Sequence, residues 1–320
     1  MNINILQGDC IETLQKLDDK SINTCITSPP YWGLRDYGET DQLGLEDTPE
    51  EFVENLVKVF REVKRVLRDD GTVWLNLGDT YSSHKDCKST PQSLAKGMQS
   101  EVAHVIEKGR SVSRNTKKLK AAGLKNKDLI GIPWRVALAL QEDGWYLRQD
   151  IIWHKPNPMP ESVKDRCTKA HEYIFLLSKS PKYYFDNESI KEDAVGNSPN
   201  NKKPHKHQGQ PFSRTKENLV NIQAVKKRNK RSVWTVTTKP FKGAHFATFP
   251  MDLIEPCVLA GCPEGGTVLD PFGGSGTTGI VAVNHNRNAT LCELNKEYIE
   301  IAKKRIEEQA GMLANVEVLK

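Results

Sequence analysis

The chain has 320 residues, of which 37% are hydrophobic, so it is long enough for one large α/β domain with insertions or for two smaller domains. We expect neither a transmembrane helix nor a secretory signal, because no apolar run approaches the length of a membrane span and the N-terminal stretch lacks a basic region followed by an apolar one. The seven cysteines form no CxxC pair, which argues against a zinc site or a disulfide framework and indicates reduced thiols in a cytoplasmic protein.

The net charge of +5 is unevenly distributed along the chain. Residues 82–128 hold 11 Lys and Arg against 4 Asp and Glu, and residues 186–245 hold 13 against 5. The remainder therefore carries a net charge of −10. An acidic body with two basic segments favours a polyanionic partner, although solvated loops without a partner would have the same composition.

The first part of the chain alternates between strands and helices. We predict strands at 3–6, 22–27 and 72–77, and helices at 10–17 and 49–68. The second helix opens with Pro49, and its apolar side chains recur at helical spacing: Phe52, Leu56, Val59, Phe60, Val63 and Leu67. Strand–helix–strand units of this length predict a parallel sheet that is covered by helices.

The regular pattern is interrupted twice, at 80–128 and from 186 to about 231, where polar and basic residues indicate surface segments. Between these segments we predict a helix at 133–142 and strands at 145–153, 172–179 and 182–185. After them we predict a strand at 232–236 and a helix at about 251–260. The remaining elements alternate again, with strands at 267–270, 289–293 and 315–319 and helices at 276–284 and 296–309.

A glycine-rich turn, "TVLDPFGGSGTTG", follows the strand that begins at residue 267. Gly274, Gly276 and Gly279 fit GxGxxG, a weak signal on its own, because glycines let a backbone approach a ligand but also form ordinary turns. Glu293 ends the next strand, where a carboxylate accepts hydrogen bonds from ribose hydroxyls. A nucleoside-bearing cofactor is therefore predicted, and no lysine follows the glycines as a P-loop requires.

A second loop, "TSPPYWG", follows the strand at 22–27. Its two prolines fix the backbone and leave carbonyl groups free to accept hydrogen bonds. Together with "DPFGGSGTT", this loop resembles the amino-group DNA methyltransferases, which methylate N4 of cytosine or N6 of adenine. The order of the two loops, catalytic loop first and cofactor loop last, resembles the permuted β group of that family.

The resemblance implies an α/β fold with a Rossmann-like, mostly parallel sheet and helices on both faces, as in S-adenosylmethionine-dependent methyltransferases, with permuted motifs and basic inserts. It divides the methyltransferase domain into a catalytic-loop half (1–81), a continuation (129–185) and a cofactor-binding half (246–320). The basic insert (82–128) and a basic DNA-recognition segment (186–245) separate them. These two segments fall where the family carries variable elements that contact DNA.

The resemblance also implies a cofactor, S-adenosyl-L-methionine, and no metal. "GDC" at 8–10 occupies the place of an adenine contact, and "HFATFP" at 245–250 is similar to the segment that closes over the methionine end. Asp270 and Glu293 are expected to hold the methionine and ribose ends. The expected cofactor-binding residues are Asp9, Cys10, Thr248, Phe249, Asp270, Phe272, Gly274, Gly276, Thr277, Thr278 and Glu293.

Double-stranded DNA is the expected partner, and the segment 151–174 is similar to the family segment beside the base pocket. The expected DNA-binding residues are Trp32, Lys155, Asn157, Lys226, Lys227, Arg228, Lys230 and Arg231. We expect a protein of bacterial or phage origin that acts on DNA in the cytoplasm and not at a membrane. The resemblance leaves open whether a cognate restriction endonuclease exists and whether the chain forms a homodimer.

The catalytic residues implied are Ser28, Pro29, Pro30 and Tyr31. An exocyclic amino nitrogen is a poor nucleophile, because its lone pair is delocalised into the ring. The Ser28 hydroxyl and the Pro29 carbonyl can each accept one amino hydrogen, which favours a pyramidal nitrogen, while Pro30 stiffens the loop and Tyr31 stacks on a base flipped out of the duplex. Serine at position 28 favours cytosine N4, with adenine N6 as the alternative.

Three other classes of protein would account for only part of the sequence. A methyltransferase acting on the C5 carbon of cytosine needs a thiolate in a Pro-Cys loop, but Pro256–Cys257 falls inside a predicted helix, so Cys257 is interpreted as a core thiol. An NAD(P)-dependent oxidoreductase using GSGTTG would leave "TSPPYWG" and the basic segments unexplained. A DNA-binding module without catalysis has no use for a cofactor loop.

Overall fold

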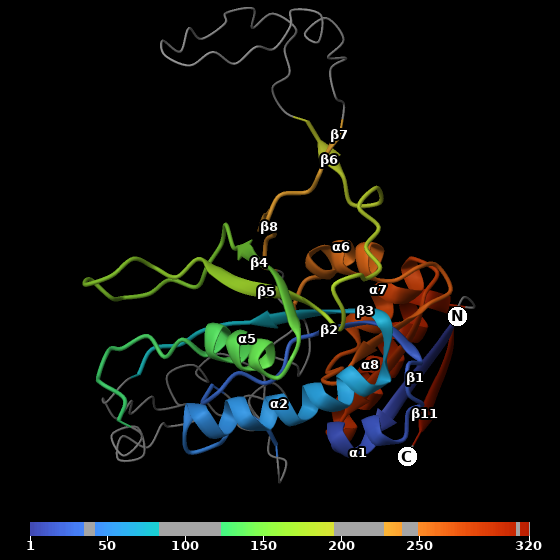
Figure 1. The fold of residues 1–320 in the computed structure, drawn as a ribbon, viewed down its shortest axis with the longest axis horizontal. Helices are drawn as coiled ribbons and strands as arrows, with labels where there is room; N and C mark the ends of the chain where they lie inside the picture. The colour runs from blue at the N-terminus through green and yellow to red at the C-terminus, as the bar shows by residue number, and fades with distance from the viewer. Residues whose placement is uncertain (35–41, 83–122, 195–226, 239–248, 312–313, 320) are drawn as a thin grey trace, which may run out of the picture.

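The computed structural model describes residues 1–34, 42–82, 123–194, 227–238, 249–311 and 314–319 (Figure 1). The strands are β1 (Asn2–Gln7), β2 (Ile22–Thr27), β3 (Leu67–Leu77), β4 (Tyr146–His154), β5 (His171–Ser178), β6 (Glu192–Asp193), β7 (Lys227–Arg228), β8 (Val233–Thr235), β9 (Thr267–Asp270), β10 (Asn288–Glu293) and β11 (Asn315–Leu319). The helices are α1 (Cys10–Gln15), α2 (Pro49–Val66), α5 (Ile132–Glu142), α6 (Met251–Gly261), α7 (Thr277–Asn284) and α8 (Lys296–Ala310).

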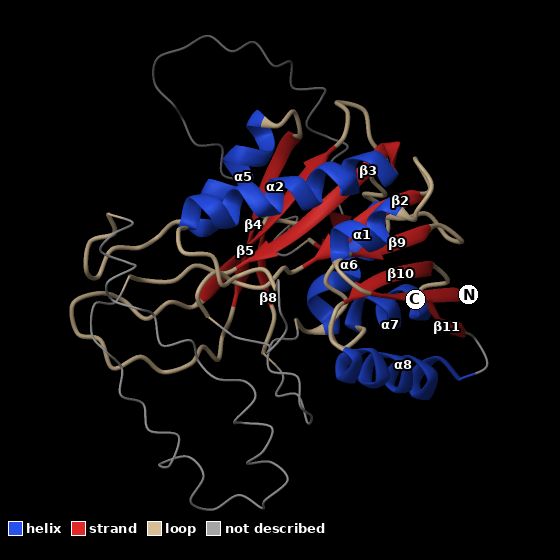
Figure 2. Cartoon of the chain, turned by 90° about the horizontal axis from the view of Figure 1, so that it is seen from below, coloured by secondary structure: helices blue, strands red, loops and turns tan. Residues whose placement is uncertain are grey.

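Within the described ranges, nine strands form one sheet in the order β11-β1-β10-β9-β2-β3-β5-β4-β8. Every neighbouring pair is parallel except β3 with β5 and β5 with β4. Helices α1, α2 and α5 cover one face and α6, α7 and α8 the other, so that each face has its own apolar core (Figure 2). The predicted α/β class, with helices on both faces of a mostly parallel sheet, is confirmed.

The helix α2 shows why the sequence folds in this way. The Thr48 side chain accepts from the backbone N–H of Glu51, and the Glu51 carboxylate accepts from the backbone N–H of Thr48, which satisfies two donors at the helix start. The predicted apolar face is completely buried against the sheet, as the 0% exposure of Phe52, Leu56 and Phe60 shows. The helix thereby covers the β2–β3 half of the sheet.

The prediction of a strand at 182–185 is wrong. These residues have no strand structure. The strands β3, β5 and β4 are each paired on both sides, in the order β2-β3-β5-β4-β8, so none of them has a free edge for a further strand. The aromatic side chains that suggested a strand instead pack across the sheet, with the rings of Phe185 and Trp74 stacked at 6.1 Å between centroids. Residues 83–122 and 195–226, which make up most of the two basic segments, lie outside the described residues.

One edge of the sheet collects the motifs. The parallel strands β1, β10, β9, β2 and β3 all end there, and the antiparallel strand β5 begins there, because Tyr173 pairs with Leu77. The strand β4 also ends at this edge, since His154 pairs with His171. β9 and β2 are far apart in sequence but are neighbours at the centre of the sheet. At a point where the strand order of an α/β sheet reverses in this way, ligands bind in the crevice outside the carboxyl ends of the strands.

Candidate active site at the carboxyl edge of the sheet

The glycine loop between β9 and α7 lies tightly against β10 and α8. The Gly273 N–H donates to the Cys292 carbonyl over 2.8 Å, and a Cβ at Gly273 would stand 2.8 Å from the Leu291 Cβ. Gly276 has a φ of +77° and a Cβ there would stand 3.0 Å from the Ala302 Cβ. Glycine is therefore required at both positions, because the backbone itself makes the close approach.

The carboxylate of Glu293 joins the loops at the ends of β10 and β9. Its Oε2 accepts from the Gly274 N–H and its Oε1 from the Asn295 N–H, each over 2.8 Å, and its main-chain carbonyl accepts from the Gly8 N–H over 3.0 Å. Burial raises the pKa of this carboxyl to about 7, against the hydrogen bonds that favour its charged form. Glu293 therefore gathers three loops at one place, where the sequence predicted a ribose contact.

Asp9 and Cys10, predicted to bind the cofactor, stand at the start of α1. One Asp9 oxygen, Oδ1, accepts from the N–H groups of Ile11 and Glu12 at 2.8 and 3.1 Å and so caps the helix. Cys10 is buried, and burial raises the pKa of its thiol far above the ordinary value. Asp9 is thus held at the cofactor edge, whereas the Cys10 side chain belongs to the core.

Asp270 does not face the open edge, contrary to the expectation that it holds the methionine end directly. It is 1% exposed, its Oδ1 accepts from the Thr27 hydroxyl at 2.6 Å and from the Phe272 N–H at 3.1 Å, and its Oδ2 accepts from the Thr278 hydroxyl at 2.7 Å. Thr277 and Thr278 are likewise buried. The reason is positional, because Asp270 ends the central strand and fills the space beneath the loop. It joins the glycine loop to Thr27, immediately before Ser28.

Arg305 of α8 also holds the glycine loop, and the sequence analysis missed it. Its guanidinium donates to the Ser275 carbonyl and, over 2.6 Å, to the Ser275 hydroxyl. Burial lowers the pKa of this guanidinium. Helical periodicity in α8 shows only which residues face the sheet, so a long polar side chain that crosses to another loop leaves no local signal.

The loop after β2 carries the predicted catalytic residues. Pro29 is buried, and Ser28, Pro30 and Tyr31 are partly buried. The Ser28 hydroxyl stands 3.4 Å from the Tyr31 hydroxyl. The Tyr31 ring lies against the backbone of Gly78, where a Cβ would stand 2.6 Å from the ring carbon Cε2. The loop is therefore positioned by contacts with the strand next to it.

Two polar residues that the sequence analysis did not select, Asn76 and Glu172, lie beside the Tyr31 hydroxyl, and Lys155, which was predicted to bind DNA, supports Glu172. Tyr31 donates to Oε2 of Glu172 over 2.8 Å and approaches Oδ1 of Asn76 at 3.3 Å. Asn76 donates to the Tyr173 carbonyl over 3.0 Å, and Lys155 forms an ion pair with Oε1 of Glu172. Asn76 and Glu172 are polar residues inside apolar strands, a signal that could have drawn attention to them.

Trp32, predicted to contact DNA, is 3% exposed, and its indole N–H donates to the Glu46 carbonyl over 3.0 Å. Trp32 comes shortly after the two prolines in the sequence, and its side chain lies in the core beside α2 instead of facing solvent. This position does not fit a direct DNA contact. Trp32 instead supports the catalytic loop from below.

The remaining predicted DNA-binding residues are dispersed. Lys155 lies 4.1 Å above the Trp153 ring, in addition to its ion pair, and Asn157 exchanges hydrogen bonds with the Thr238 backbone at 3.0 Å each. Arg228 and Arg231 both pair with Glu192, whereas Lys230 lies above the ring of Trp234. Lys227 is exposed, Phe249 packs partly buried on the α6–α8 side, and Lys226 and Thr248 lie outside the described residues.

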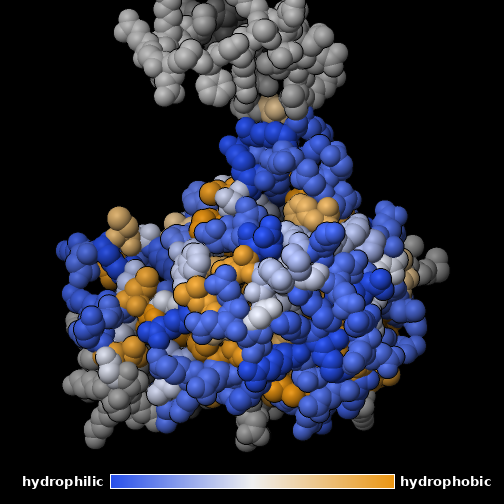
Figure 3. Space-filling view, viewed as in Figure 1, coloured by the Kyte–Doolittle hydropathy of each residue, from blue (hydrophilic) through white to orange (hydrophobic). Residues whose placement is uncertain are grey.

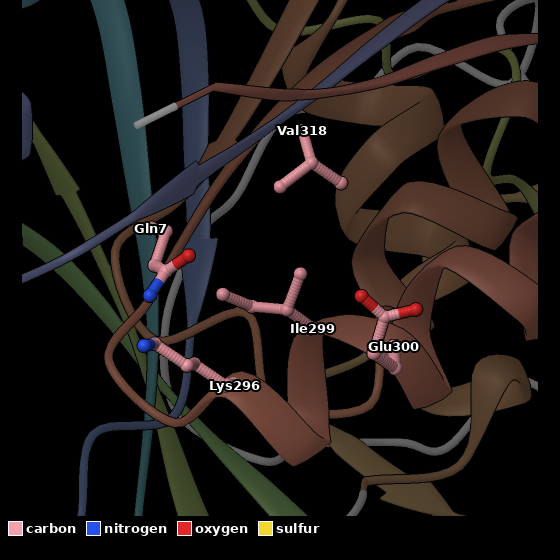
Figure 4. A pocket seen from close by; sticks show the side chains of 5 residues that line it. All are labelled: Gln7, Lys296, Ile299, Glu300 and Val318. Atoms are coloured by element: carbon pink, nitrogen blue, oxygen red, sulfur yellow. The ribbon is translucent and has the colours of Figure 1, made fainter.

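A surface hollow lies beside the cofactor edge, between β1, β11 and α8 (Figure 4). It is lined by Gln7, Lys296, Ile299, Glu300 and Val318. Gln7 directly precedes Gly8, but none of the predicted catalytic residues lines this hollow. The face shown in Figure 3 is mostly hydrophilic, with apolar surface in scattered areas. Within the described ranges, no cluster of His, Cys, Asp and Glu is arranged to hold a metal, and no helix is long and apolar enough to span a membrane.

Residues 22–304 match the DNA methylase family of N6 and N4 methyltransferases, and the chain belongs to this family. The Type II methyltransferase M.SmaI of Serratia marcescens is 47% identical over 308 residues, which cover 94% of this chain and 90% of the relative. The Type II methyltransferase M.Cfr9I of Citrobacter freundii is 46% identical over 303 residues, which cover 95% and 87%.

Solved structures share the architecture. TTHA0409 of Thermus thermophilus, in complex with S-adenosyl-L-methionine, has a TM-score of 0.60 at 24% identity and covers 99% of this chain and 100% of its own. The cytosine-N4-specific PvuII DNA methyltransferase has a TM-score of 0.61 at 18% identity, with coverages of 100% and 96%. The fold is thus that of S-adenosylmethionine-dependent methyltransferases, and the protein is a DNA methyltransferase of the amino-group family.

Proposed function

We propose that this DNA methyltransferase transfers the methyl group of S-adenosyl-L-methionine to the exocyclic N4 of cytosine in a base flipped out of duplex DNA. The observation that carries the proposal is the Thr27–Asp270 hydrogen bond of 2.6 Å, which fixes the glycine loop and the Ser28–Tyr31 loop against one another. An alkyl transfer between two bound molecules requires this kind of mutual positioning.

The loops at the ends of β9, β10 and β1 fit a nucleoside-bearing cofactor. A Cβ at Gly273 or Gly276 would collide with neighbouring side chains, so these glycines let the loop lie close against β10 and α8. Glu293 supplies a carboxylate for the ribose, and Asp9 supplies one at the next strand end for the adenine. When bound, the cofactor supplies an electrophilic methyl group. Asp270 holds the loop in place from beneath.

Ser28 and Pro29 localise the lone pair of the nucleophile. The Ser28 hydroxyl and the Pro29 carbonyl each accept a hydrogen bond from one N–H of the amino group. The two bonds favour a pyramidal nitrogen, whose lone pair then points toward the methyl group. Tyr31 stacks on the base, and its hydroxyl is held by Glu172 over 2.8 Å, so that the ring keeps one orientation. Catalysis then depends on positioning and on preorganised dipoles, since no covalent intermediate on the protein is needed.

The target atom cannot be reached inside a duplex, so the base must leave the stack. The two basic segments, 82–128 and 186–245, neutralise phosphates and follow the backbone of the DNA. Lys227 and Lys230 are the candidates for this role among the described residues of the second segment. A Type II modification system, as the names of the similar enzymes state, is the setting that we propose, with a cognate restriction endonuclease as partner.

Serine at position 28 supports cytosine over adenine, and adenine N6 is the alternative product of the same arrangement. Transfer to the C5 carbon of cytosine is not favoured, because Cys257 is 1% exposed inside α6 and burial raises the pKa of its thiol far above the ordinary value. The match to the DNA methylase family argues against an NAD(P)-dependent oxidoreductase, and we expect thermal stabilisation by S-adenosylhomocysteine and not by NAD.

Modification-sensitive sequencing of genomic DNA tests the proposal in an expressing host. We expect modified cytosines within one recurring sequence motif, and a smaller modified fraction in a host that expresses a Ser28→Ala variant at the same level, because that variant should transfer the methyl group more slowly. Unmodified DNA in the host that expresses the wild-type protein would contradict the proposed activity. The same experiment identifies the recognition sequence.

A further inference from the structure

A long loop, residues 155–170, joins β4 to β5 at the carboxyl edge. It extends beyond the ends of both strands (Figure 1). The Lys155 N–H donates to the Ala170 carbonyl over 2.8 Å and closes the base of the loop. The Lys155 side chain forms an ion pair with Glu172, which holds the Tyr31 hydroxyl. The loop is therefore anchored directly beside the catalytic loop.

The outer part of this loop exposes one large apolar side chain, Met159, to solvent. Met159 is 84% exposed, more than any other large apolar residue in the described part of the chain, and Val233 follows at 59%. Pro158 and Pro160 stand on either side of Met159, and each fixes one backbone dihedral angle. The folded chain buries little of this side chain, so Met159 adds little to the hydrophobic stability of the fold and is available for contact with a partner.

Both sides of Met159 are held by side chains that bond to the backbone. On one side, Asn157 exchanges two hydrogen bonds of 3.0 Å with the Thr238 backbone, close to β8. On the other side, the Glu161 carboxylate accepts from Arg166 over 2.6 Å and from the Lys169 N–H over 3.3 Å. These charged and hydrogen-bonded neighbours lower the pKa of Glu161. The Met159 side chain is thus exposed on a backbone that is held in place.

From this arrangement we propose that Met159 is a wedge that enters the base stack of the DNA and occupies space that the flipped base leaves. The inference rests on the proposed function, because it requires a base to leave the duplex. Apolar side chains, methionine among them, are inserted between base steps by proteins that unstack DNA, and the flexible methionine side chain adapts to the gap. Lys164, exposed on the same loop, supplies positive charge for the adjacent backbone.

The location of the loop determines which base is affected. Met159 follows Lys155 by four positions, so the two Cα atoms lie within about 14 Å of each other. Lys155 in turn bonds to the residue that holds Tyr31. A duplex that delivers its target base to Tyr31 therefore brings the vacated position, or the step next to it, within reach of Met159.

The test compares Met159→Ala with Met159→Leu on two duplexes that carry the genomic site of the enzyme. One duplex is fully paired, and in the other the target base is mispaired, so that unpairing costs less. We expect Met159→Ala to lower kcat/KM about tenfold on the paired duplex and less than about twofold on the mispaired one, since unstacking a base costs a few kcal/mol. Met159→Leu should restore most of the rate, because it retains an apolar wedge.

A matched control and a direct probe accompany the kinetics. Leu319→Ala removes a side chain that is 42% exposed on β11, at the far end of the sheet, and should leave both rates unchanged. With 2-aminopurine at the target position, binding of the wild-type enzyme should increase fluorescence, and Met159→Ala should give a smaller increase. Because Met159 packs against so little of the protein, thermal unfolding of the variant should equal that of the wild type.

Equal losses on the paired and mispaired duplexes would overturn the wedge, because they would show an ordinary contact with DNA. Unchanged rates on both duplexes would overturn it as well, including the case in which Met159→Ala changes only the association of the protein with itself or with another protein. Failure of the proposed function has a separate signature, because the wild-type enzyme would then methylate neither duplex. A wild type that methylates adenine would leave the wedge testable in the same assay.

Discussion

Tyr31 and Glu172 are joined by a hydrogen bond of 2.8 Å, in which the Tyr31 hydroxyl donates to the carboxylate. Glu172 belongs to β5, which is antiparallel to its neighbours and begins at the edge where β2 ends. The carboxylate is held on its other side by Lys155. The orientation of the aromatic ring that we expect to stack on the base is therefore set by a strand 141 residues further along the chain.

Tyr31→Phe tests this hydrogen bond separately from stacking. The variant keeps the ring and removes the hydroxyl, so we expect the rate of methyl transfer to fall about tenfold, in line with about 1.5 kcal/mol for a hydrogen bond to a charged group. Tyr31→Ala should in addition weaken retention of the flipped base by about 1–3 kcal/mol. Single-turnover kinetics measures both, and equal rates for wild type and Tyr31→Phe would contradict a role for Glu172 as a positioning residue.

Ser28→Ala tests the acceptor. Removal of one preorganised contact in a transition state lowers the rate about 10²–10³-fold where the contact is strong. Because the Ser28 hydroxyl is neutral, we expect Ser28→Ala to lower the rate about 10²-fold or less. The affinity for S-adenosyl-L-methionine should stay the same, because the hydroxyl serves the base and not the cofactor. The matched control is Ser21→Ala, which removes an exposed hydroxyl just before the same strand. Equal losses of rate and cofactor affinity in Ser28→Ala would contradict this division of roles.

Asp270→Ala should weaken cofactor binding and stability together. The variant leaves the hydroxyls of Thr27 and Thr278 and the N–H of Phe272 without their acceptor, and each unsatisfied buried group costs about 1–3 kcal/mol. Urea unfolding should therefore show a lower free energy of unfolding than in the control Asp150→Ala, which changes an exposed residue of β4. Calorimetry that finds lost cofactor affinity with unchanged stability would instead support a direct contact between Asp270 and the cofactor.

The affinity for the cofactor should depend on pH through Glu293. Burial raises the pKa of this carboxyl to about 7. The charged carboxylate is a better acceptor of hydrogen bonds from ribose hydroxyls than the protonated form. Affinity measured by calorimetry should therefore rise between about pH 6 and pH 8. Glu293→Gln should remove the dependence, whereas Glu300→Gln, an exposed position on α8, should keep it. An affinity that does not change with pH in the wild type would contradict a carboxylate at the ribose.

The same pKa predicts the sign of a stability effect. Because the pKa of Glu293 is higher in the folded protein than its value of about 4.3 in an unfolded chain, the folded state binds the proton more tightly. The contribution of Glu293 to the free energy of unfolding is therefore largest below about pH 4.3 and is lost as the pH rises to about 7. The difference in stability between wild type and Glu293→Gln should follow this pH range.

The sequence predicted the elements that carry the two motifs well, for a physical reason. The strands at 22–27 and 267–270 were predicted with the bounds that the structure has, because each is a short stretch rich in β-branched residues that ends abruptly at a proline or glycine loop. By contrast, the aromatic segment 182–185 has the composition of a strand but no strand structure. Strand composition reflects packing on a half-buried surface as much as pairing, and here only the packing is realised.

The supporting residues of the site could not be predicted in the same way. Glu172 reaches Tyr31 only because β5 runs antiparallel to β3, and Arg305 reaches Ser275 only because α8 packs across the glycine loop. Neither relationship has a period or a fixed spacing in the sequence. Asp270 was correctly associated with the cofactor loop, but its burial depends on Thr27 and Thr278, which meet it only in the folded sheet.

The central claim, methyl transfer to cytosine N4, is tested most directly by mass spectrometry of nucleosides from DNA that was incubated with the purified enzyme and S-adenosyl-L-methionine. We predict N4-methylcytosine, in an amount that depends on Ser28. N6-methyladenine would contradict the choice of base and retain the two acceptors, because they can hold either amino group. 5-Methylcytosine would contradict the mechanism itself, since that product requires attack by a thiolate, and Cys257 is buried inside α6.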